Sequence, residues 1–232
     1  MTTTAPITTT PGPASAIRRP RFGFALAIVT QIAMMTGASA PSPFYPVLAA
    51  EIGFDAIVIS AVFAVYAIAL LLALLSAGSL SDHIGRRPVA IGGLLLLAGS
   101  MLLFWHADSV ATLMLARILQ GAASGVLIAA LSAAALDLAP GGRSRVAALW
   151  NALSPGIGLA LGALVSGIAL DVTGQPLLDV FAPLTVIYLV LAALFFLAPE
   201  TAPLHPGAWG SLSFRLSVPA GIRSDSVSYT HL

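Results

Sequence analysis

The residues best suited to specific chemistry cluster in the segment GSLSDHIGRR, which begins at Gly78. Gly78 and Gly85 permit close helix approach and a positive φ in a tight turn. Asp82 follows an apolar stretch, at the carboxyl end of the helix expected there, where the helix dipole disfavours a carboxylate. Such a carboxylate needs a cationic partner, and Arg86 lies four residues away with Arg87 beside it. The alternative, that the arginines only fix membrane topology, explains neither the aspartate nor the glycines around it.

A second candidate is Arg117, which lies inside an apolar stretch and is followed by Gln120 and Gly121. A charged side chain in hydrocarbon costs at least ~2.5–3.5 kcal/mol on insertion scales. We therefore expect Arg117 to face the interior of a bundle or a water-filled cavity and to have a partner there. The alternative is that its long side chain reaches outward to the membrane surface.

A later apolar stretch is rich in small residues and contains Pro155, Gly158, Gly162 and Gly167. Gly158 and Gly162 form a small-xxx-small face, which predicts close packing against another helix.

Three polar residues stand within other apolar stretches: Gln31, Tyr66 and Asn151. They could line a central substrate cavity, or each could hydrogen-bond a neighbouring helix, which is the ordinary role of a lone amide. No pair of histidines has metal-ligand spacing, so we predict no metal site. No Gly-rich loop carries a lysine, so ATP is not the predicted energy source, and we predict no cofactor.

The composition of the chain predicts that these residues lie on or between membrane-spanning helices. Of the 232 residues, 58% are hydrophobic and 8% are charged, against about 25% charged residues in a soluble domain. This composition excludes a water-soluble enzyme, a nucleic-acid-binding protein and a disordered scaffold. The absence of cysteine excludes disulfides and thiolate metal sites.

The sequence predicts an all-α membrane protein with six spanning helices, because about 20 apolar residues cross the hydrocarbon core. The expected spans are residues 22–40, 57–77, 89–105, 110–136, 146–170 and 177–198. Residues 1–21, rich in Thr and Pro, are expected to form a disordered cytoplasmic tail ahead of a bundle over 22–199.

Arginines mark one side of the predicted membrane. Nine of the ten basic residues fall in the N-terminal flank, in alternate breaks between spans and in the C-terminal tail, and all ten are arginine. Arginine-rich loops stay cytoplasmic, so we expect a multi-pass protein of the cell membrane, the inner membrane in a bacterium, with both termini in the cytoplasm. The alternative, a cleaved secretory signal ending near Ala40, would break this alternation.

The segment from Gly78 resembles the loop signature of the major facilitator superfamily, G-x-L-x-D-x-x-G-R-R/K, at every fixed position. The stretch from Arg117 resembles the helix 4 signature of that family, R-x-x-Q-G-x-x-x-A/G. The stretch from Gly158 is similar to its antiporter signature, G-x-x-x-G-P-x-x-G-G. It departs from that pattern at Ala163, which replaces the proline, and at Ser166, which replaces a glycine.

The resemblance implies a transporter, not an enzyme, made of two six-helix halves that rock around a central site for a small molecule. It implies that Asp82 and the arginines after it lock a cytoplasmic gate, and that Arg117 couples transport to protons. The expected function is therefore proton-coupled transport of small organic molecules by alternating access, with efflux by antiport slightly favoured over uptake.

The resemblance covers one six-helix half. Residues 200–226 are then expected to be a cytoplasmic linker toward a missing C-terminal six-helix half, and 227–232 resemble a translated sequencing adapter. On this hypothesis the chain is a fragment that is inactive alone. The alternatives are a six-helix membrane interaction or structural protein complete at this length, and an intramembrane enzyme, for which no nucleophile–base pair is apparent.

Overall fold

The computed structural model describes the backbone of residues 13–142 and 144–198, and side chains within 20–76, 85–141 and 144–198. The described backbone is helical and contains no strand. In chain order the elements are α1 (Pro13–Ser39), η1 (Ser42–Phe44), α2 (Tyr45–Ile52), α3 (Ala56–Ile84), α4 (Arg86–Trp105), α5 (Val110–Asp137), η2 (Pro140–Gly142), α6 (Ser144–Val172) and α7 (Pro176–Phe195). The segments predicted as linker and adapter, 200–232, lie outside the described residues.

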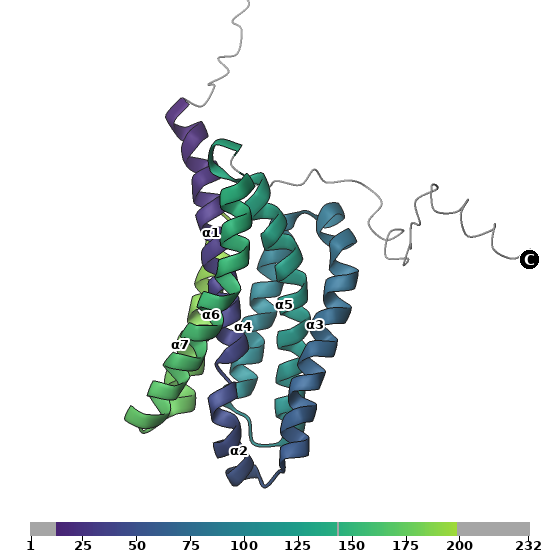
Figure 1. Cartoon of the computed structure of the whole chain (residues 1–232), viewed down its shortest axis with the longest axis vertical. Coiled ribbons are helices and arrows are strands. Elements are labelled where there is room, and N and C mark those ends of the chain that lie inside the picture. Colours follow the sequence, from purple (N-terminus) through teal and green to yellow (C-terminus); the bar gives the residue numbers. More distant parts are fainter. Residues whose placement is uncertain (1–12, 143, 199–232) are drawn as a thin grey trace, which may run out of the picture.

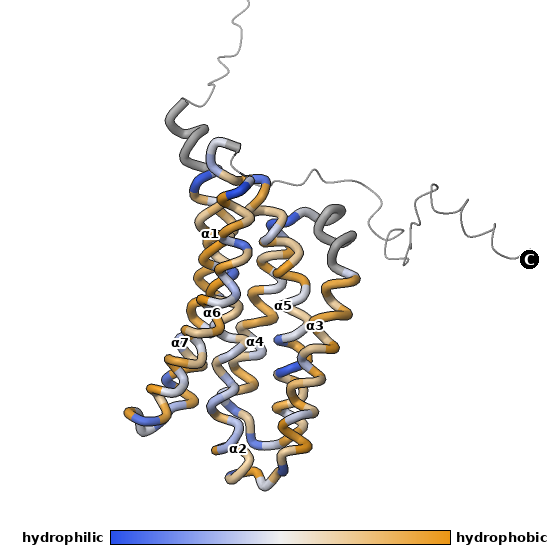
Figure 2. The backbone as a smooth tube through the Cα atoms, viewed as in Figure 1, coloured by the Kyte–Doolittle hydropathy of each residue, from blue (hydrophilic) through white to orange (hydrophobic). Residues whose placement is uncertain are grey.

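The described residues contain six helical segments long and apolar enough to cross a membrane, which confirms the predicted fold class. Along each of them apolar residues dominate, and the hydrophilic residues gather mainly at the two ends of the bundle (Figure 2). The start of α1 and the end of α7 lie at the same end, and α2 lies at the opposite one (Figure 1).

The first span begins earlier than predicted, and the break that follows it is partly helical. α1 begins at Pro13 instead of residue 22, so part of the expected disordered tail is helical. The segment 41–56, predicted as a break, contains η1 and α2, so this part of the prediction is wrong. Prolines explain the interruption, because a proline removes a backbone donor but fits the first turn of a new helix, where Pro46 lies in α2.

The segment from Gly78 is also more helical than predicted. The predicted apolar span ended at residue 77, but α3 continues to Ile84 and α4 begins at Arg86. Gly85 alone makes the connection, with φ of 101°, a conformation that favours glycine. Asp82 therefore lies in the last turn of α3, where the sequence analysis placed it.

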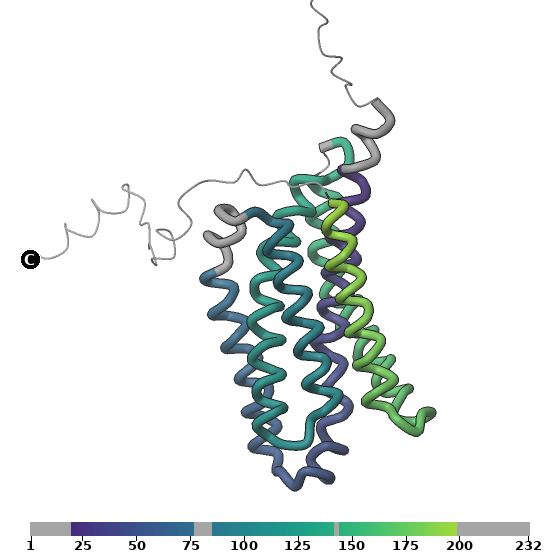
Figure 3. Tube along the Cα trace, turned by 180° about the vertical axis from the view of Figure 1, so that it is seen from behind, coloured from purple at the N-terminus to yellow at the C-terminus, as the bar shows by residue number. Residues whose placement is uncertain are grey.

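The helices pack as antiparallel and parallel neighbours around a core of aliphatic and aromatic side chains. The main partners are α3 with α5, α1 with α6, and α4 with both α5 and α7. α3 lies at one side of the bundle and α6 and α7 at the other, with α4 and α5 between them (Figures 1 and 3). α1 crosses the middle and contacts α5 and α7 as well.

Two helices leave most of their surface uncovered. We compared the 18 most apolar consecutive residues of each span. In α5, 56% of these residues are buried, whereas the shares are 6% in α3 and 28% in α6. The exposed side chains of α3 and α6 are mostly apolar and include large aliphatic ones such as Leu72 and Leu164. These two surfaces are therefore available to lipid or to another protein.

Candidate functional site

Arg117 is the most buried charged residue of the described structure. It lies in α5, its relative exposure is 1%, and it points into the bundle. Its Nε donates to the hydroxyl of Tyr45, and its Nη1 donates to the carbonyl of Ala38 at 3.1 Å and to Oε1 of Gln120 at 2.6 Å. The alternative of a side chain that reaches out to the membrane surface does not hold, because all these partners lie inside the bundle.

The carbonyls that receive these bonds belong to the last turn of α1. The last carbonyls of a helix have no partner within the helix and carry the negative end of its dipole. Arg117 bonds the carbonyl of Ala38, and Gln120 Nε2 donates to the carbonyl of Gly37 at 2.7 Å. A cation at this position is stabilised by up to about 2 kcal/mol when it is partly buried. The pair Arg117–Gln120 thus caps α1 where the chain breaks before α2.

Aromatic rings surround the guanidinium. Its Cζ lies 5.3 Å from the ring centres of Tyr45, Tyr66 and Phe104 and 5.4 Å from that of Phe63. Such contacts within about 6 Å are attractive, and more so without water. All partners that the described residues offer are neutral, and Nη2 is buried without a partner among them. The arrangement can therefore hold a cation in the span without a carboxylate.

Glycines bring α5 against the backbone of α3 beside this site. A Cβ on Gly121 would lie well inside 3.0 Å of the carbonyl oxygen of Tyr66, and one on Gly125 would do the same at Leu70. Side chains larger than hydrogen are excluded there, because interiors are close-packed. Gly121, which the sequence analysis matched to the helix 4 signature, thus has a packing role: it sets the distance between α3 and α5 beside Arg117.

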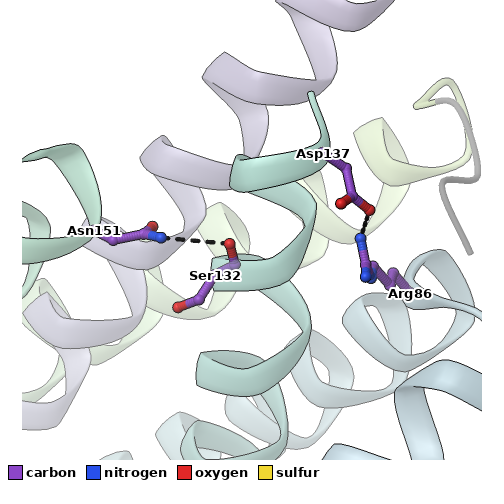
Figure 4. Close-up of polar contacts among 4 residues, drawn as sticks. All are labelled: Arg86, Ser132, Asp137 and Asn151. Atoms are coloured by element: carbon purple, nitrogen blue, oxygen red, sulfur yellow. Dashed lines mark hydrogen bonds and ion pairs between the residues drawn. The ribbon is translucent and has the colours of Figure 1, made fainter. Parts of the chain in front are cut away.

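Gln31 and Asn151 lie together in a second polar cluster, between α1, α5 and α6. Nε2 of Gln31, which is buried, donates to Oδ1 of Asn151 at 2.9 Å. Asn151 Nδ2 in turn donates to the carbonyl of Ser132 at 3.4 Å (Figure 4). The same three residues line a small cavity of about 90 Å³ with Met34 and Pro155. These amides therefore bridge helices and line this small cavity, and their role in a substrate cavity stays a prediction.

Tyr66 belongs to the other cluster. Its ring contacts Arg117, and it does not line the cavity of Gln31 and Asn151. The three residues predicted for one substrate cavity are thus divided between two places. Among the described residues no group of three His, Asp or Glu side chains could hold a metal ion.

The small residues of α6 lie against α1. A Cβ on Gly158 would lie 2.5 Å from the carbonyl oxygen of Ile32, and one on Gly162 would lie still closer to that of Thr36. Gly167 does not share this contact, because no heavy atom lies within 4 Å of the position of its Cβ. Pro155 lies inside α6, one helical turn before Gly158.

At the end of the bundle where α3 meets α4, Arg86 forms an ion pair with Asp137, the last residue of α5 (Figure 4). The side chain of Arg86 is 17% exposed and that of Asp137 is 40% exposed. Arg87 lies with its Cζ 5.5 Å from the ring centre of Phe196. The side chain of Asp82 and the surroundings of Gly78 lie outside the described residues, so the predicted pair of Asp82 with Arg86 stays a prediction.

Sequence reasoning did not single out Tyr45 and Asp137, whose side chains bind the two arginines Arg117 and Arg86. Asp137 could have been found, because a carboxylate at the carboxyl end of a helix is disfavoured by the dipole, the argument already made for Asp82. Tyr45 gave no such indication, since it lies in the break between the first two predicted spans.

The profile of the Major Facilitator Superfamily matches residues 27–227 of the chain. Over 145 residues the chain is also 30% identical to YhjO of Bacillus subtilis (strain 168), which is described as an uncharacterized MFS-type transporter. This similarity covers 62% of the chain and 35% of YhjO, so the chain matches about a third of that protein's length.

Proposed function

Because the chain belongs to the Major Facilitator Superfamily, we propose that it is part of a proton-coupled transporter of small organic molecules. The membrane location of such a protein agrees with the six apolar spans. In the proposed cycle a substrate site is exposed alternately to either side of the membrane as two halves rock against each other. Efflux by proton antiport is the favoured direction, since the residues from Gly158 follow most of the antiporter signature.

The observation that carries the proposal is the burial of Arg117 in the middle of a helical bundle. A charge is kept in a span when function requires it, because its insertion is costly. Arg117 and Gln120 bind the end of α1, so a change at the guanidinium displaces the break between α1 and α2. We propose that protonation of a neighbouring group, or of the substrate, alters these hydrogen bonds. Proton movement would thereby be coupled to the opening of the substrate site toward one side of the membrane.

The cluster of Gln31, Asn151 and Ser132 is the proposed contact with the substrate. It offers neutral hydrogen-bonding groups beside the flexible side chain of Met34. Methionine adapts to ligands of different shape, which suits a transporter of varied organic molecules.

We propose that a second six-helix half covers the exposed faces of α3 and α6. Both faces are apolar and mostly uncovered in the described structure, and the central cavity of this family lies between two halves. The segment around Asp82, Arg86 and Arg87 is the proposed gate, with Asp137 as a fixed partner of Arg86 within this half. On this proposal the 232-residue chain alone does not transport.

The proposal is tested with the full-length protein in vesicles that contain the pH indicator pyranine, under an imposed pH gradient. Ethidium serves as the first test substrate, and other fluorescent organic compounds follow. We expect substrate-dependent proton flux with the full-length protein and none with the 232-residue chain.

The variant Arg117→Ala should abolish the flux, whereas Arg145→Ala, a change at an exposed arginine, should not. Unchanged proton-driven transport by Arg117→Ala would remove Arg117 from the coupling role. Proton flux with the chain alone would contradict the need for a second half.

We further propose that the protein lies in the cell membrane with its arginine-rich end in the cytoplasm. The chain has no cysteine, so single cysteines can be labelled without background. Ser144→Cys and Gly174→Cys place exposed thiols at opposite ends of α6. A membrane-impermeant maleimide added to whole cells should label the second and not the first, and the reverse pattern would overturn the orientation.

A further inference from the structure

The interface between α1 and α7 contains a tyrosine that the sequence analysis did not single out. Tyr188 lies in α7, and its side chain is fully buried. Its hydroxyl donates to the carbonyl of Ala33 in α1 at 3.0 Å. α1 and α7 lie against each other in the bundle (Figures 1 and 3). A buried tyrosine hydroxyl usually has a hydrogen-bond partner, and here that partner belongs to a different helix.

The same hydroxyl occupies space that only a glycine leaves free. Gly37 lies in α1 one helical turn after Ala33, and a Cβ on Gly37 would overlap the hydroxyl oxygen of Tyr188. The next ring atom, Cζ, lies 3.1 Å from that Cβ position. In an α-helix each N–H donates to the carbonyl four residues earlier, so the carbonyl of Ala33 is also the helical acceptor of Gly37. Tyr188 therefore binds α1 at the turn that runs from Ala33 to Gly37.

Gly37 is also a point where α5 binds α1. The carbonyl of Gly37 accepts from Nε2 of Gln120, and the carbonyl of Ala38 accepts from Arg117. Tyr188 thus contacts Gly37 from the side of α7, and Gln120 binds it from the side of α5. Side chains from two helices meet on one residue of α1, directly before the break that leads to α2.

A second buried hydroxyl in α7 makes no such connection. Thr185 lies one turn before Tyr188 and is 8% exposed. Its hydroxyl donates to the carbonyl of Phe181, in its own helix, at 2.8 Å. Among the hydrogen bonds of the described residues, that of Thr185 therefore stays within α7, whereas that of Tyr188 joins α7 to α1.

We propose that Tyr188 is a positioning residue for Arg117 and Gln120. It acts through α1, because its hydroxyl fixes the turn from Ala33 to Gly37 and thereby the carbonyls that Arg117 and Gln120 bind. A movement of α7 then displaces these acceptors, and a change at the guanidinium is passed to α7 in return. The role in coupling rests on the proposed function, whereas the contact and its effect on α1 do not.

The contact is tested by a double-variant cycle on thermal unfolding of the purified full-length protein in detergent. Gly37→Ala should lower the unfolding midpoint or prevent folding, because its methyl group overlaps the hydroxyl of Tyr188. In the Tyr188→Phe background the same change should lower the midpoint by no more than about half as much, since residues in contact have non-additive effects. Equal shifts in the two backgrounds, or loss of the fold in both, would overturn the contact and the proposal with it.

The effect on α1 is tested by amide hydrogen exchange, which does not require transport. Exchange reports local opening of a helix. Tyr188→Phe should accelerate exchange in residues 36–45, where α1 ends. Thr185→Val, which removes a buried hydroxyl from the same helix, is the matched control and should exchange as the parent does. Parental exchange in Tyr188→Phe would show that Tyr188 does not hold the end of α1.

The effect on coupling is tested with the same two variants in the vesicle assay with ethidium. The readout is the number of protons moved per ethidium, because a smaller amount of folded protein lowers both fluxes equally. Tyr188→Phe should lower this ratio to about half or less, since misplaced acceptors weaken the coupling through Arg117, and Thr185→Val should keep the parental ratio. A parental ratio in Tyr188→Phe would overturn the proposal and leave the proposed function intact. A parent protein that moves ethidium without protons would refute the proposed coupling instead.

Discussion

Replacement of Gly162 by alanine should loosen the contact between α6 and α1. The added methyl group would overlap the carbonyl oxygen of Thr36 and the hydroxyl of Ser39. Overpacking of this kind costs about 1–3 kcal/mol. Ser39 Oγ also donates to the carbonyl of Leu159 at 2.8 Å, a bond between the two helices worth about 1 kcal/mol. We therefore expect a loss of about 2–4 kcal/mol when both effects act.

The control is Gly167→Ala in the same helix. No heavy atom lies within 4 Å of its Cβ position, while the gain in helix propensity, up to about 1 kcal/mol, is the same at both sites. The difference between the two variants therefore isolates the contact between helices.

The assay is reversible unfolding by dodecyl sulfate in mixed micelles, followed by circular dichroism, since the chain has no cysteine for thiol-reactive dyes. Equal free energies of unfolding for the two variants, within about 0.5 kcal/mol, would refute the close approach of α1 and α6.

Three further predictions concern the polar sites. Tyr45→Phe leaves Nε of Arg117 without its acceptor, and we expect a loss of about 1–3 kcal/mol in the same unfolding assay; an unchanged stability would count against this bond. Arg117→Lys keeps the charge but loses the planar guanidinium, whose N–H groups reach both Ala38 and Tyr45. In the vesicle assay this variant should retain less than a tenth of the parent's proton flux. Parental flux would show that the charge alone suffices. Asp137→Asn removes a partly exposed ion pair with Arg86 and should cost at most about 1 kcal/mol; a larger loss that persists in 1 M salt, where the Debye length is about 3 Å, would point to a different structural role.

The sequence by itself was sufficient to predict how many helices span the membrane and where they lie along the chain. A span must be apolar over its whole length, so composition alone reveals it, and each of the six predicted spans differs from the observed helix mainly at its ends. The short signatures were also sufficient to identify the family, because they are matched by residue type and spacing alone and need no knowledge of contacts in the fold. The need of Arg117 for internal partners followed from the cost of a charge in hydrocarbon.

The identity of those partners was decided by the tertiary structure. Arg117 meets Ala38 and Tyr45, which lie more than 70 residues earlier in the chain, and no local pattern relates positions so far apart. The partner carbonyls are backbone groups, which every residue type carries, so their availability depends on where α1 ends. The helix α2 was missed for a related reason, since prolines that usually mark a loop here begin a new helix at the end of the bundle.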